Sequence, residues 1–324
     1  MMIVRKYTFL LFLALLMMAC NRDSVDDVQF GVRVEKTENR NVTFLFSGNA
    51  DYITFYSGDF ENNYEHIGRS RVELSELEMS CTIRQQYNDV NYLDKEVVFA
   101  YISKDFSGIY TVEELSKATW IPISGREAHR LTVPVPTSAA EVEVASRIDL
   151  SQFIGLDEKF YIAFQYNAAG RSEIPSANSN GKYTTRPRVD VTALNLRRKD
   201  IHGQEFYTNE TSTEWGFRII YQESVGSNYQ LTDDGFLLQP GKGYIDATTQ
   251  KENNEVVWLV SGLLDPSAVE PDRGIALKSI EGSLKSYTHT YKNAGEYTAT
   301  FIATNANLWE SSQMIEQINV TVNP

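Results

Sequence analysis

The stretch that decides the fold is Tyr297-Thr298-Ala299-Thr300-Phe301-Ile302-Ala303-Thr304. Its residues alternate in character with a period of two, which places alternate side chains on opposite faces of a β-strand. A turn signal, Asn293-Ala294-Gly295, lies just before it, and a polar stretch, 305–312, follows. The residues therefore predict a strand bounded by turns near the end of the chain.

The same kind of pattern recurs along the chain. Val42-Thr43-Phe44-Leu45-Phe46 alternates, whereas 159–164 and 255–260 are apolar enough to predict strands buried on both faces. Helical periodicity is best at 112–118, which would form about two turns. Many short strands joined by short turns predict an all-β protein built from sandwiches or barrels, not from a βαβ sheet.

The composition narrows the class of protein. The 324 residues are 42% hydrophobic and 23% charged, which excludes a disordered chain and a polytopic membrane protein. There are 30 Lys and Arg against 43 Asp and Glu, a net charge of −13 that repels phosphate backbones, so we expect no nucleic-acid partner. With two cysteines and four histidines, a disulfide scaffold and a Cys/His zinc site are both disfavoured.

The N-terminus has the layout of an export signal. Two basic residues, Arg5 and Lys6, precede an apolar core at 7–18 and the small residue Ala19. That core is shorter than the ~20 residues needed to span a bilayer. A buried helix is the alternative, but such helices rarely open a chain behind two basic residues. We therefore expect residues 1–19 to be a signal peptide. The residues around the cleavage site, described next, indicate the lipoprotein type.

Those residues, Leu15-Leu16-Met17-Met18-Ala19-Cys20, resemble a bacterial lipobox, although Met17 stands where Leu is usual. The resemblance implies that Cys20 is acylated, becomes the mature N-terminus and holds the protein on outer-membrane lipid. The acidic tether at 20–27 resembles the surface-export signal of Bacteroidetes lipoproteins, which implies an outward-facing location. The alternative is an ordinary secreted protein.

Cleavage has two consequences for the mature chain. It removes Arg5 and Lys6, so the net charge falls from −13 to −15. It also leaves Cys81 without a disulfide partner if Cys20 is acylated. Cys81 alternates with polar residues in a strand pattern, which predicts a buried and inert thiol.

The C-terminal strand belongs to a larger motif. Residues 287–297, which contain the turn at Gly295, resemble the second half of a PKD-type immunoglobulin-like sandwich, together with the strand that follows them. Three strands at 28–34, 42–46 and 52–56, with a hairpin at Ser57-Gly58-Asp59, would supply the first half.

We therefore predict one discontinuous immunoglobulin/PKD-like sandwich, made of residues 28–70 with 264–324, and a second domain at 71–263 inserted into it. The alternative is two or three sandwiches in series.

The inserted segment has its own motif. Ser103-Lys104-Asp105-Phe106-Ser107-Gly108, then Ala118-Thr119-Trp120 and Tyr161-Ile162-Ala163-Phe164, resemble the galactose-binding-like jelly rolls of bacterial surface proteins. With the lipobox and the last sandwich, the chain resembles an uncharacterised Bacteroides surface lipoprotein family, often found near starch-utilisation-type transport loci. The resemblance implies an architecture and a location but no chemistry.

No catalytic motif stands out. The sequence contains no P-loop, no His-Glu-x-x-His and no Gly-x-Ser-x-Gly, and its four histidines lie far apart. A pair of glycosidase carboxylates is a spatial feature that sequence does not show. We therefore predict that the protein is not an enzyme.

Glycan binding needs an exposed aromatic ring. Trp120, Trp215 and Trp258 lie in apolar strand patterns and are predicted to be core residues. Trp309 lies in the polar connection 305–312 and is the candidate ring, unless it folds over the sandwich edge.

Two further sets of charged residues are weaker candidates for binding, one for an anionic ligand or partner and the other for calcium. Arg197 and Arg198, in a local basic patch, could bind an anionic sugar or a partner, or could simply pair with neighbouring acids. We predict no cofactor, with structural calcium as an option. The weak calcium candidates are Asp89, Asp94, Asp105 and Asp157.

The sequence thus predicts a lipid-anchored cell-surface binding protein that captures glycan in a polysaccharide-uptake system. The first alternative is an adhesive or structural lipoprotein acting through contacts with proteins, such as other surface lipoproteins. The second is a glycan hydrolase.

Overall fold

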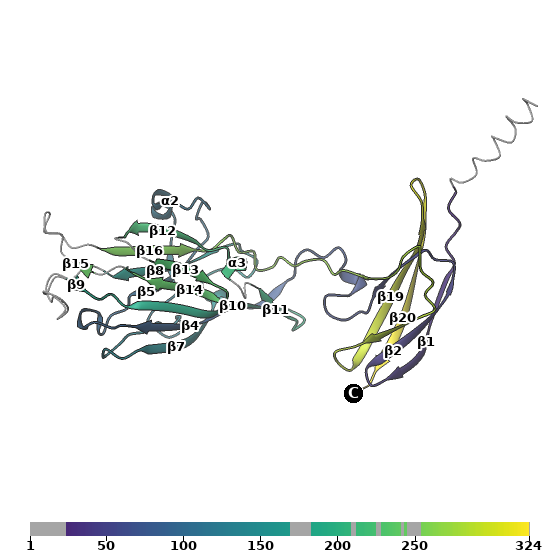
Figure 1. Ribbon diagram of the computed structural model, residues 1–324, viewed down its shortest axis with the longest axis horizontal. Coiled ribbons are helices and arrows are strands. Elements are labelled where there is room, and N and C mark those ends of the chain that lie inside the picture. Colours follow the sequence, from purple (N-terminus) through teal and green to yellow (C-terminus); the bar gives the residue numbers. More distant parts are fainter. Residues whose placement is uncertain are drawn as a thin grey trace, which may run out of the picture. The chain divides into compact units, whose positions relative to one another are not determined.

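The computed structural model describes residues 24–168, 183–208, 212–224, 228–240, 243–244 and 254–323. Within these ranges the regular structure is mostly β-strand, and all pairs of named strands are antiparallel (Figure 1). The all-β class and its antiparallel sheets are therefore confirmed.

The chain divides into two compact units. Among the described residues, unit 1 comprises 24–70 and 269–323, and unit 2 comprises the rest, from Arg71 to Ala268. The sequence pattern predicts the second boundary between residues 263 and 264. In the structure Leu264 forms a bridge with Phe160 and is buried in the core of unit 2, so residues 264–268 belong to that unit.

Unit 1 contains two antiparallel sheets. One has the order β1-β2-β18 and the other has the order β17-β3-β19-β20. Their bounds are β1 Phe30–Glu38, β2 Asn41–Gly48, β3 Tyr52–Tyr56, β17 Ile275–Lys278, β18 Ser286–Thr290, β19 Gly295–Ala306 and β20 Ser311–Val322. A short 3-10 helix, η2 (Tyr64–His66), follows β3.

Two local predictions in unit 1 were inexact. β1 runs to Glu38 instead of ending at Val34, because Asn39 and Arg40 adopt positive φ angles of 48° and 67° and close a tight hairpin with β2. The turn at residues 57–59 does not join two strands of a hairpin. It closes a small loop, in which Asp59 bridges Asn62, and the chain then leaves for unit 2.

The core of unit 1 lies between its sheets and is rich in phenylalanine. The Phe301 ring on β19 lies 5.0 Å from the ring of Phe44 and 4.9 Å from that of Phe55, measured between centroids. Phe30 and Phe46 complete the cluster. The alternation that predicted β19 therefore points its apolar set, including Ala299 and Ala303, into this core.

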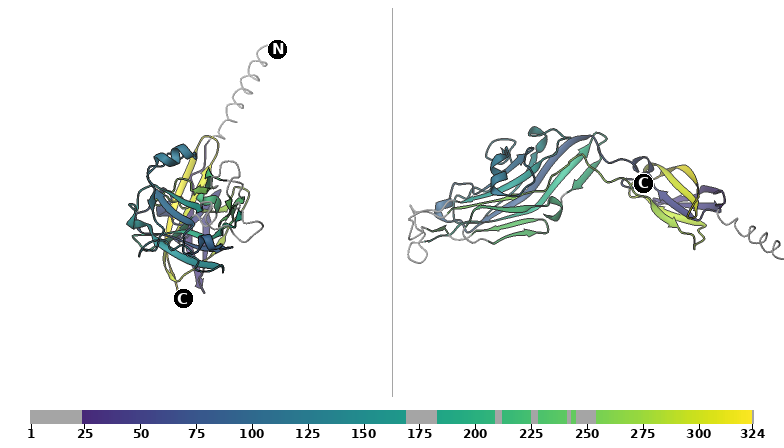
Figure 2. Two further views of the ribbon diagram at one scale, coloured as in Figure 1. Left: turned by 90° about the vertical axis from the view of Figure 1, so that its left-hand side faces the viewer. Right: turned by 90° about the horizontal axis from the view of Figure 1, so that it is seen from above.

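Unit 2 contains two large sheets and one short strand pair (Figures 1 and 2). The first sheet has the order β13-β14-β10-β4-β7, with β11 also paired to β10. Its bounds are β4 Leu74–Gln86, β7 Val142–Asp149, β10 Arg188–Asp200, β11 Glu205–Thr208, β13 Asn228–Thr232 and β14 Gly235–Gln239.

The second sheet of unit 2 has the order β12-β16-β8-β5-β6. Its bounds are β5 Val98–Ser103, β6 Ile121–Pro122, β8 Tyr161–Ala168, β12 Arg218–Glu223 and β16 Glu255–Val260. The short strand pair is formed by β9 Tyr183–Thr184 and β15 Gly243–Tyr244. The short helices are α2 Val112–Lys117, α3 Ser212–Trp215, η3 Val90–Tyr92 and η4 Leu150–Gln152. The helix predicted at 112–118 is confirmed as α2.

The main core of unit 2 takes one face of each sheet. Ile162, Phe164 and Tyr166 of β8 belong to it, as do Val257 and Leu259 of β16. Cys81 is a free thiol in this core, as predicted, and burial raises its pKa to about 12. At neutral pH the thiol is therefore protonated and a poor nucleophile.

Phe301→Ala should destabilise unit 1 strongly. Replacing a fully buried phenylalanine by alanine typically costs about 3–5 kcal/mol, because it removes buried area and leaves a cavity. For a unit of this size that loss lowers the melting temperature by more than about 10 °C. Calorimetry of the mature protein would measure it, with the exposed Phe60→Ala as the matched control. Equal melting temperatures for the two variants would contradict the central role of Phe301 in the core.

His289 should make unit 1 less stable in acid. Burial among the rings of Phe55 and Tyr291 lowers the pKa of His289, and Asp59 opposes this only in part. The unfolded chain therefore binds a proton at a higher pH than the folded chain does. This contribution to stability is complete above the ordinary histidine pKa and is lost as the pH falls through the folded pKa. His289→Phe should reduce the loss of stability between neutral and mildly acidic pH, measured by denaturant unfolding at each pH; an unchanged pH profile would contradict it.

Candidate functional site

The two candidate arginines lie on opposite faces of β10. Arg197 is half-buried and forms ion pairs with Glu76 at 3.0 Å and Glu205 at 2.9 Å. Arg198 is 4% exposed, and its guanidinium donates to the backbone oxygens of Pro266 at 2.5 Å and Ala268 at 2.7 Å. The two side chains therefore do not form a common surface patch, and the contacts of Arg198 are structural.

The four aspartates considered for calcium lie in separate local structures. Asp89 caps η3 by accepting from the backbone nitrogen of Asn91 at 3.0 Å. Asp105 accepts hydrogen bonds inside its own loop, whereas Asp94 and Asp157 are exposed. Within the described ranges no group of three or more His, Cys, Asp or Glu side chains could hold a metal ion.

The four tryptophans have different surroundings. Trp215 is fully buried in the main core of unit 2, as predicted. Trp258 is buried and Trp120 half-buried, but both lie in a separate cluster on the outer face of the second sheet. Trp120, predicted to be a core residue, is therefore only partly buried and packs against this cluster. Trp309 is 71% exposed, at the turn between β19 and β20.

This second cluster, the outer aromatic face, arises because β8 and β16 are apolar on both sides. Tyr161 and Ala163 of β8, with Trp258 and Val260 of β16, point away from the main core. Residues of the segment 104–120, which includes α2, pack onto them, and α2 lies beside β12 (Figure 1). The apolar runs at 159–164 and 255–260 were therefore correctly predicted to be buried on both faces.

The motif Ser103-Lys104-Asp105-Phe106-Ser107-Gly108 fixes that covering segment. The Asp105 carboxylate accepts from the Ser103 hydroxyl at 2.9 Å and from the backbone nitrogen of Thr119 at 2.8 Å, which ties the two ends of the loop together. The hydrogen bonds from Thr119 lower the pKa of Asp105, so the carboxylate is charged at neutral pH. Gly108 has a φ of +77°, and a Cβ there would lie 2.9 Å from the Tyr161 hydroxyl oxygen.

Phe106 is the centre of the face. Its ring centroid lies 5.1 Å from that of Tyr161, 5.5 Å from that of Tyr110 and 5.6 Å from that of Trp120. Trp258 lies 5.6 Å from Trp120 and 5.0 Å from Tyr101, again between centroids. Tyr101, Tyr110 and Trp120 are half-buried, so these rings remain partly accessible around a buried centre.

Polar groups border these rings. Trp258 Nε1 donates to Gln222 Oε1 at 3.0 Å, and the Tyr101 hydroxyl donates to Gln165 Oε1 at 3.4 Å. The Arg218 guanidinium lies 5.0 Å from the centroid of the Tyr110 ring. Burial raises the pKa of Tyr101, so its hydroxyl stays protonated at neutral pH. Neither glutamine amide nitrogen has a hydrogen bond to a described residue, which leaves both as donors at the edge of an aromatic surface.

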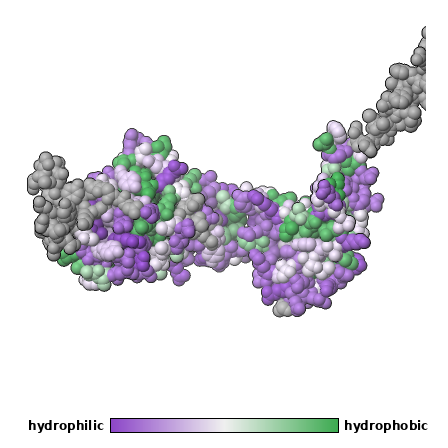
Figure 3. All heavy atoms as spheres, in the orientation of Figure 1, coloured by the Kyte–Doolittle hydropathy of each residue, from purple (hydrophilic) through white to green (hydrophobic). Residues whose placement is uncertain are grey.

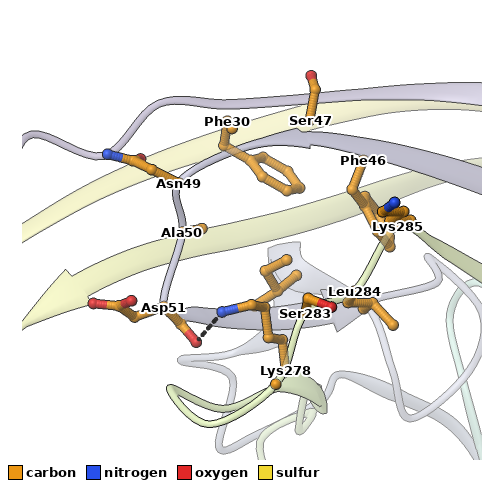
Figure 4. Close-up of a pocket in the computed structure, with 13 residues that line it drawn as sticks. Phe30, Phe46, Ser47, Asn49, Ala50, Asp51, Lys278, Ser283, Leu284 and Lys285 are labelled. Atoms are coloured by element: carbon orange, nitrogen blue, oxygen red, sulfur yellow. Dashed lines mark hydrogen bonds between the residues drawn. The ribbon is translucent and has the colours of Figure 1, made fainter.

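Unit 1 contains an open cavity of about 430 Å³ at the end where β1 begins (Figure 4). Phe30, Phe46, Asp51 and Lys285 are among the residues that line it. Lys278 crosses it and donates to the backbone oxygen of Asp51 at 3.0 Å. The cavity brings together none of the residues that sequence analysis selected.

The predicted signal peptide, 1–19, and Cys20 lie outside the described residues. Of the helices in the described ranges, none is long and apolar enough to cross a membrane.

Residues 19–213 match a family described as a domain of unknown function, DUF5017. No curated protein and no solved structure matches the chain. Since the family match covers more than half of the 324 residues, the chain belongs to the DUF5017 family.

Proposed function

We propose that this protein is a lipid-anchored cell-surface protein that binds glycan through the outer aromatic face of unit 2. The observation that carries the proposal is the set of partly accessible rings of Tyr101, Tyr110 and Trp120, bordered by the amides of Gln165 and Gln222. Sugar rings present an apolar C–H face and a rim of hydroxyls. Aromatic planes with amide groups at their edge match both features.

The rigidity of the face also supports glycan binding. Phe106 fills the space beneath the rings, and Asp105 joins the ends of the covering loop. Rings held in this way lose little conformational freedom when a ligand binds, so more of the contact energy appears as affinity. The non-enzymatic assignment is part of the proposal, and it rests on the sequence, which contains no P-loop, no His-Glu-x-x-His and no Gly-x-Ser-x-Gly motif.

The finer fold assignment is also part of the proposal. In unit 1, two antiparallel sheets share one apolar core, which is compatible with an immunoglobulin/PKD-like sandwich. In unit 2, two larger sheets share the main core, which is compatible with a galactose-binding-like jelly roll. Jelly rolls are common among lectin domains, so the assignment agrees with the proposed ligand class.

The location rests on the N-terminal sequence. The signal-like residues 1–19, the lipobox ending at Cys20 and the acidic residues after it support export and acylation, with the protein facing outward from the outer membrane. A protein anchored in this way would hold glycan at the cell surface for a polysaccharide-uptake system. Adhesion through protein contacts and glycan hydrolysis are the competing functions.

Trp120→Ala should weaken retention on a bound polysaccharide by about 30-fold, because removing a central aromatic anchor typically costs about 2 kcal/mol. Gln222→Ala, which keeps every ring but removes the bordering amide and the acceptor of Trp258 Nε1, should weaken it to a smaller extent. Affinity electrophoresis against a polysaccharide panel would measure both, with the exposed Tyr207→Ala as control. A panel that retains none of the wild-type protein would refute glycan binding and favour adhesion, whereas release of reducing sugar would favour hydrolysis.

Cys20→Ala should abolish acylation, so that the chain accumulates as an uncleaved or soluble form. Metabolic labelling with palmitate and fractionation of the cells would measure this. Cys81→Ala is the matched control, because it removes the other cysteine and should keep the label. Continued labelling of the Cys20 variant would refute the proposed anchor.

A further inference from the structure

The closed end of the β19–β20 hairpin exposes two adjacent apolar side chains. Leu308 is 87% exposed and Trp309 is 71% exposed. Figure 3 shows hydrophobic surface at this end of the hairpin. Turn positions usually carry Gly, Pro, Asn, Asp or Ser, so two large apolar residues at a turn call for a contact that covers them.

The turn is held in a fixed conformation. The Asn307 side-chain oxygen accepts from the backbone nitrogens of Trp309 and Glu310, both at 2.8 Å. The backbone nitrogen of Asn307 donates to the oxygen of Glu310 at 3.0 Å. These bonds close the turn within the hairpin itself, so Leu308 and Trp309 are presented outward by a rigid support rather than by a long loop.

The same end of unit 1 receives the N-terminal tether. The backbone nitrogen of Val28 donates to the Ser312 hydroxyl at 3.0 Å, and Asn305 donates to the backbone oxygen of Asp26 at 3.2 Å. Cys20 precedes Asp26 by six residues, and an extended chain spans at most ~3.6 Å per residue, so the link reaches no more than about 22 Å. A lipid on Cys20 would therefore keep the hairpin end close to the bilayer.

Other side chains at this end have mixed character. The connection from β17 to β18 lies there, because the last residue of β17 pairs with Ile53 near the start of β3, and the first residue of β18 pairs with Leu45 in the second half of β2. It carries Ile280, which is 58% exposed, and the exposed Lys285. The acids of the tether and Glu310 offset the lysines, so charge does not draw this end toward an anionic surface.

We propose that Leu308 and Trp309 insert into the headgroup region of the bilayer that holds the acylated Cys20. This inference rests on the lipid anchor of the proposed function. Tryptophan favours the membrane interface, where its ring is partly in apolar surroundings and its N–H finds polar partners. Leucine adds apolar area to the same contact.

The contact orients the protein and does not anchor it. Even a single myristoyl chain gives only marginal membrane binding, so two side chains cannot hold the protein on a bilayer alone. Once the tether confines the hairpin near the surface, insertion becomes an intramolecular step at high effective concentration. Unit 1 then contacts the bilayer at two places, the acylated N-terminus and the hairpin turn.

The test couples the mature chain, beginning at Cys20, through its thiol to a maleimide lipid in phosphatidylcholine vesicles. Cys81 does not compete, because it is buried and its pKa is raised to about 12. Tryptophan emission is compared in vesicles with and without brominated phosphatidylcholine. We expect quenching in the coupled wild-type protein, and its loss in Trp309→Phe and in the double variant Leu308→Ser/Trp309→Ser.

The matched control is Phe60→Ser/Ile67→Ser, which removes two exposed apolar residues from the segment after β3 and should be quenched like the wild type. Equal emission of the coupled wild-type protein on brominated and ordinary lipid would overturn the inference. Quenching found only with added phosphatidylglycerol would also overturn it, because the contact would then depend on the attraction of the lysines to anionic lipid and not on insertion of Leu308 and Trp309. So would a change in Trp309 emission with polysaccharide but not with lipid. Because the coupling is chemical, these outcomes are independent of whether cells acylate Cys20, which the palmitate label decides.

Discussion

The nested arrangement depends on how the outgoing and returning segments of the chain are held together. Arg71 bridges Ala268, and its guanidinium binds the Asp265 carboxylate at 2.9 and 3.1 Å. Backbone bonds from Val72 to Ser267 and from Val269 to Ser70 flank the bridge. Since the entropy of closing a loop rises only slowly with its length, a long insertion is tolerated once its ends are fixed side by side. Arg198 reinforces the returning segment from within unit 2, because its buried guanidinium donates to the backbone oxygens of Pro266 and Ala268.

That crossing is what allows unit 1 to form from distant parts of the sequence. β3 pairs with β19, and the Phe55 ring meets the Phe301 ring across a separation of more than two hundred residues. Neither segment contains enough apolar residues to build the core alone, because the phenylalanines come from β1, β2 and β3 on one side and from β19 on the other. Unit 1 is therefore complete only after the chain has returned, and contacts of such long range form slowly.

The sequence revealed the strands better than it revealed their surroundings. A period of two identifies β19 and the two-faced strands β8 and β16, because alternation is a property of neighbouring residues. It does not show what lies on the outer face of a sheet, so Trp120 was predicted to be a core residue although it is only partly buried, in the segment 104–120 that covers this face. The burial of Arg198 was not predicted for a similar reason, because it depends on the carbonyl groups of Pro266 and Ala268, which lie far along the chain. The boundary near residue 264 was misplaced because Leu264 finds its partner, Phe160, more than a hundred residues earlier.

The tryptophans show how neighbours determine what a ring can do. Trp120 has another indole at 5.6 Å and lies in a cluster bordered by side-chain amides, so its accessible surface is a flat, supported plane with hydrogen-bonding groups beside it. Trp309 lies beside Leu308 at the tip of a turn, without a ring contact among the described residues. A sugar gains from the first setting, because it needs a plane and directional partners together. A bilayer interface requires no such shape complementarity, and the second setting provides apolar area where the tether keeps lipid within reach. The two proposed contacts therefore draw on different properties of the same residue type.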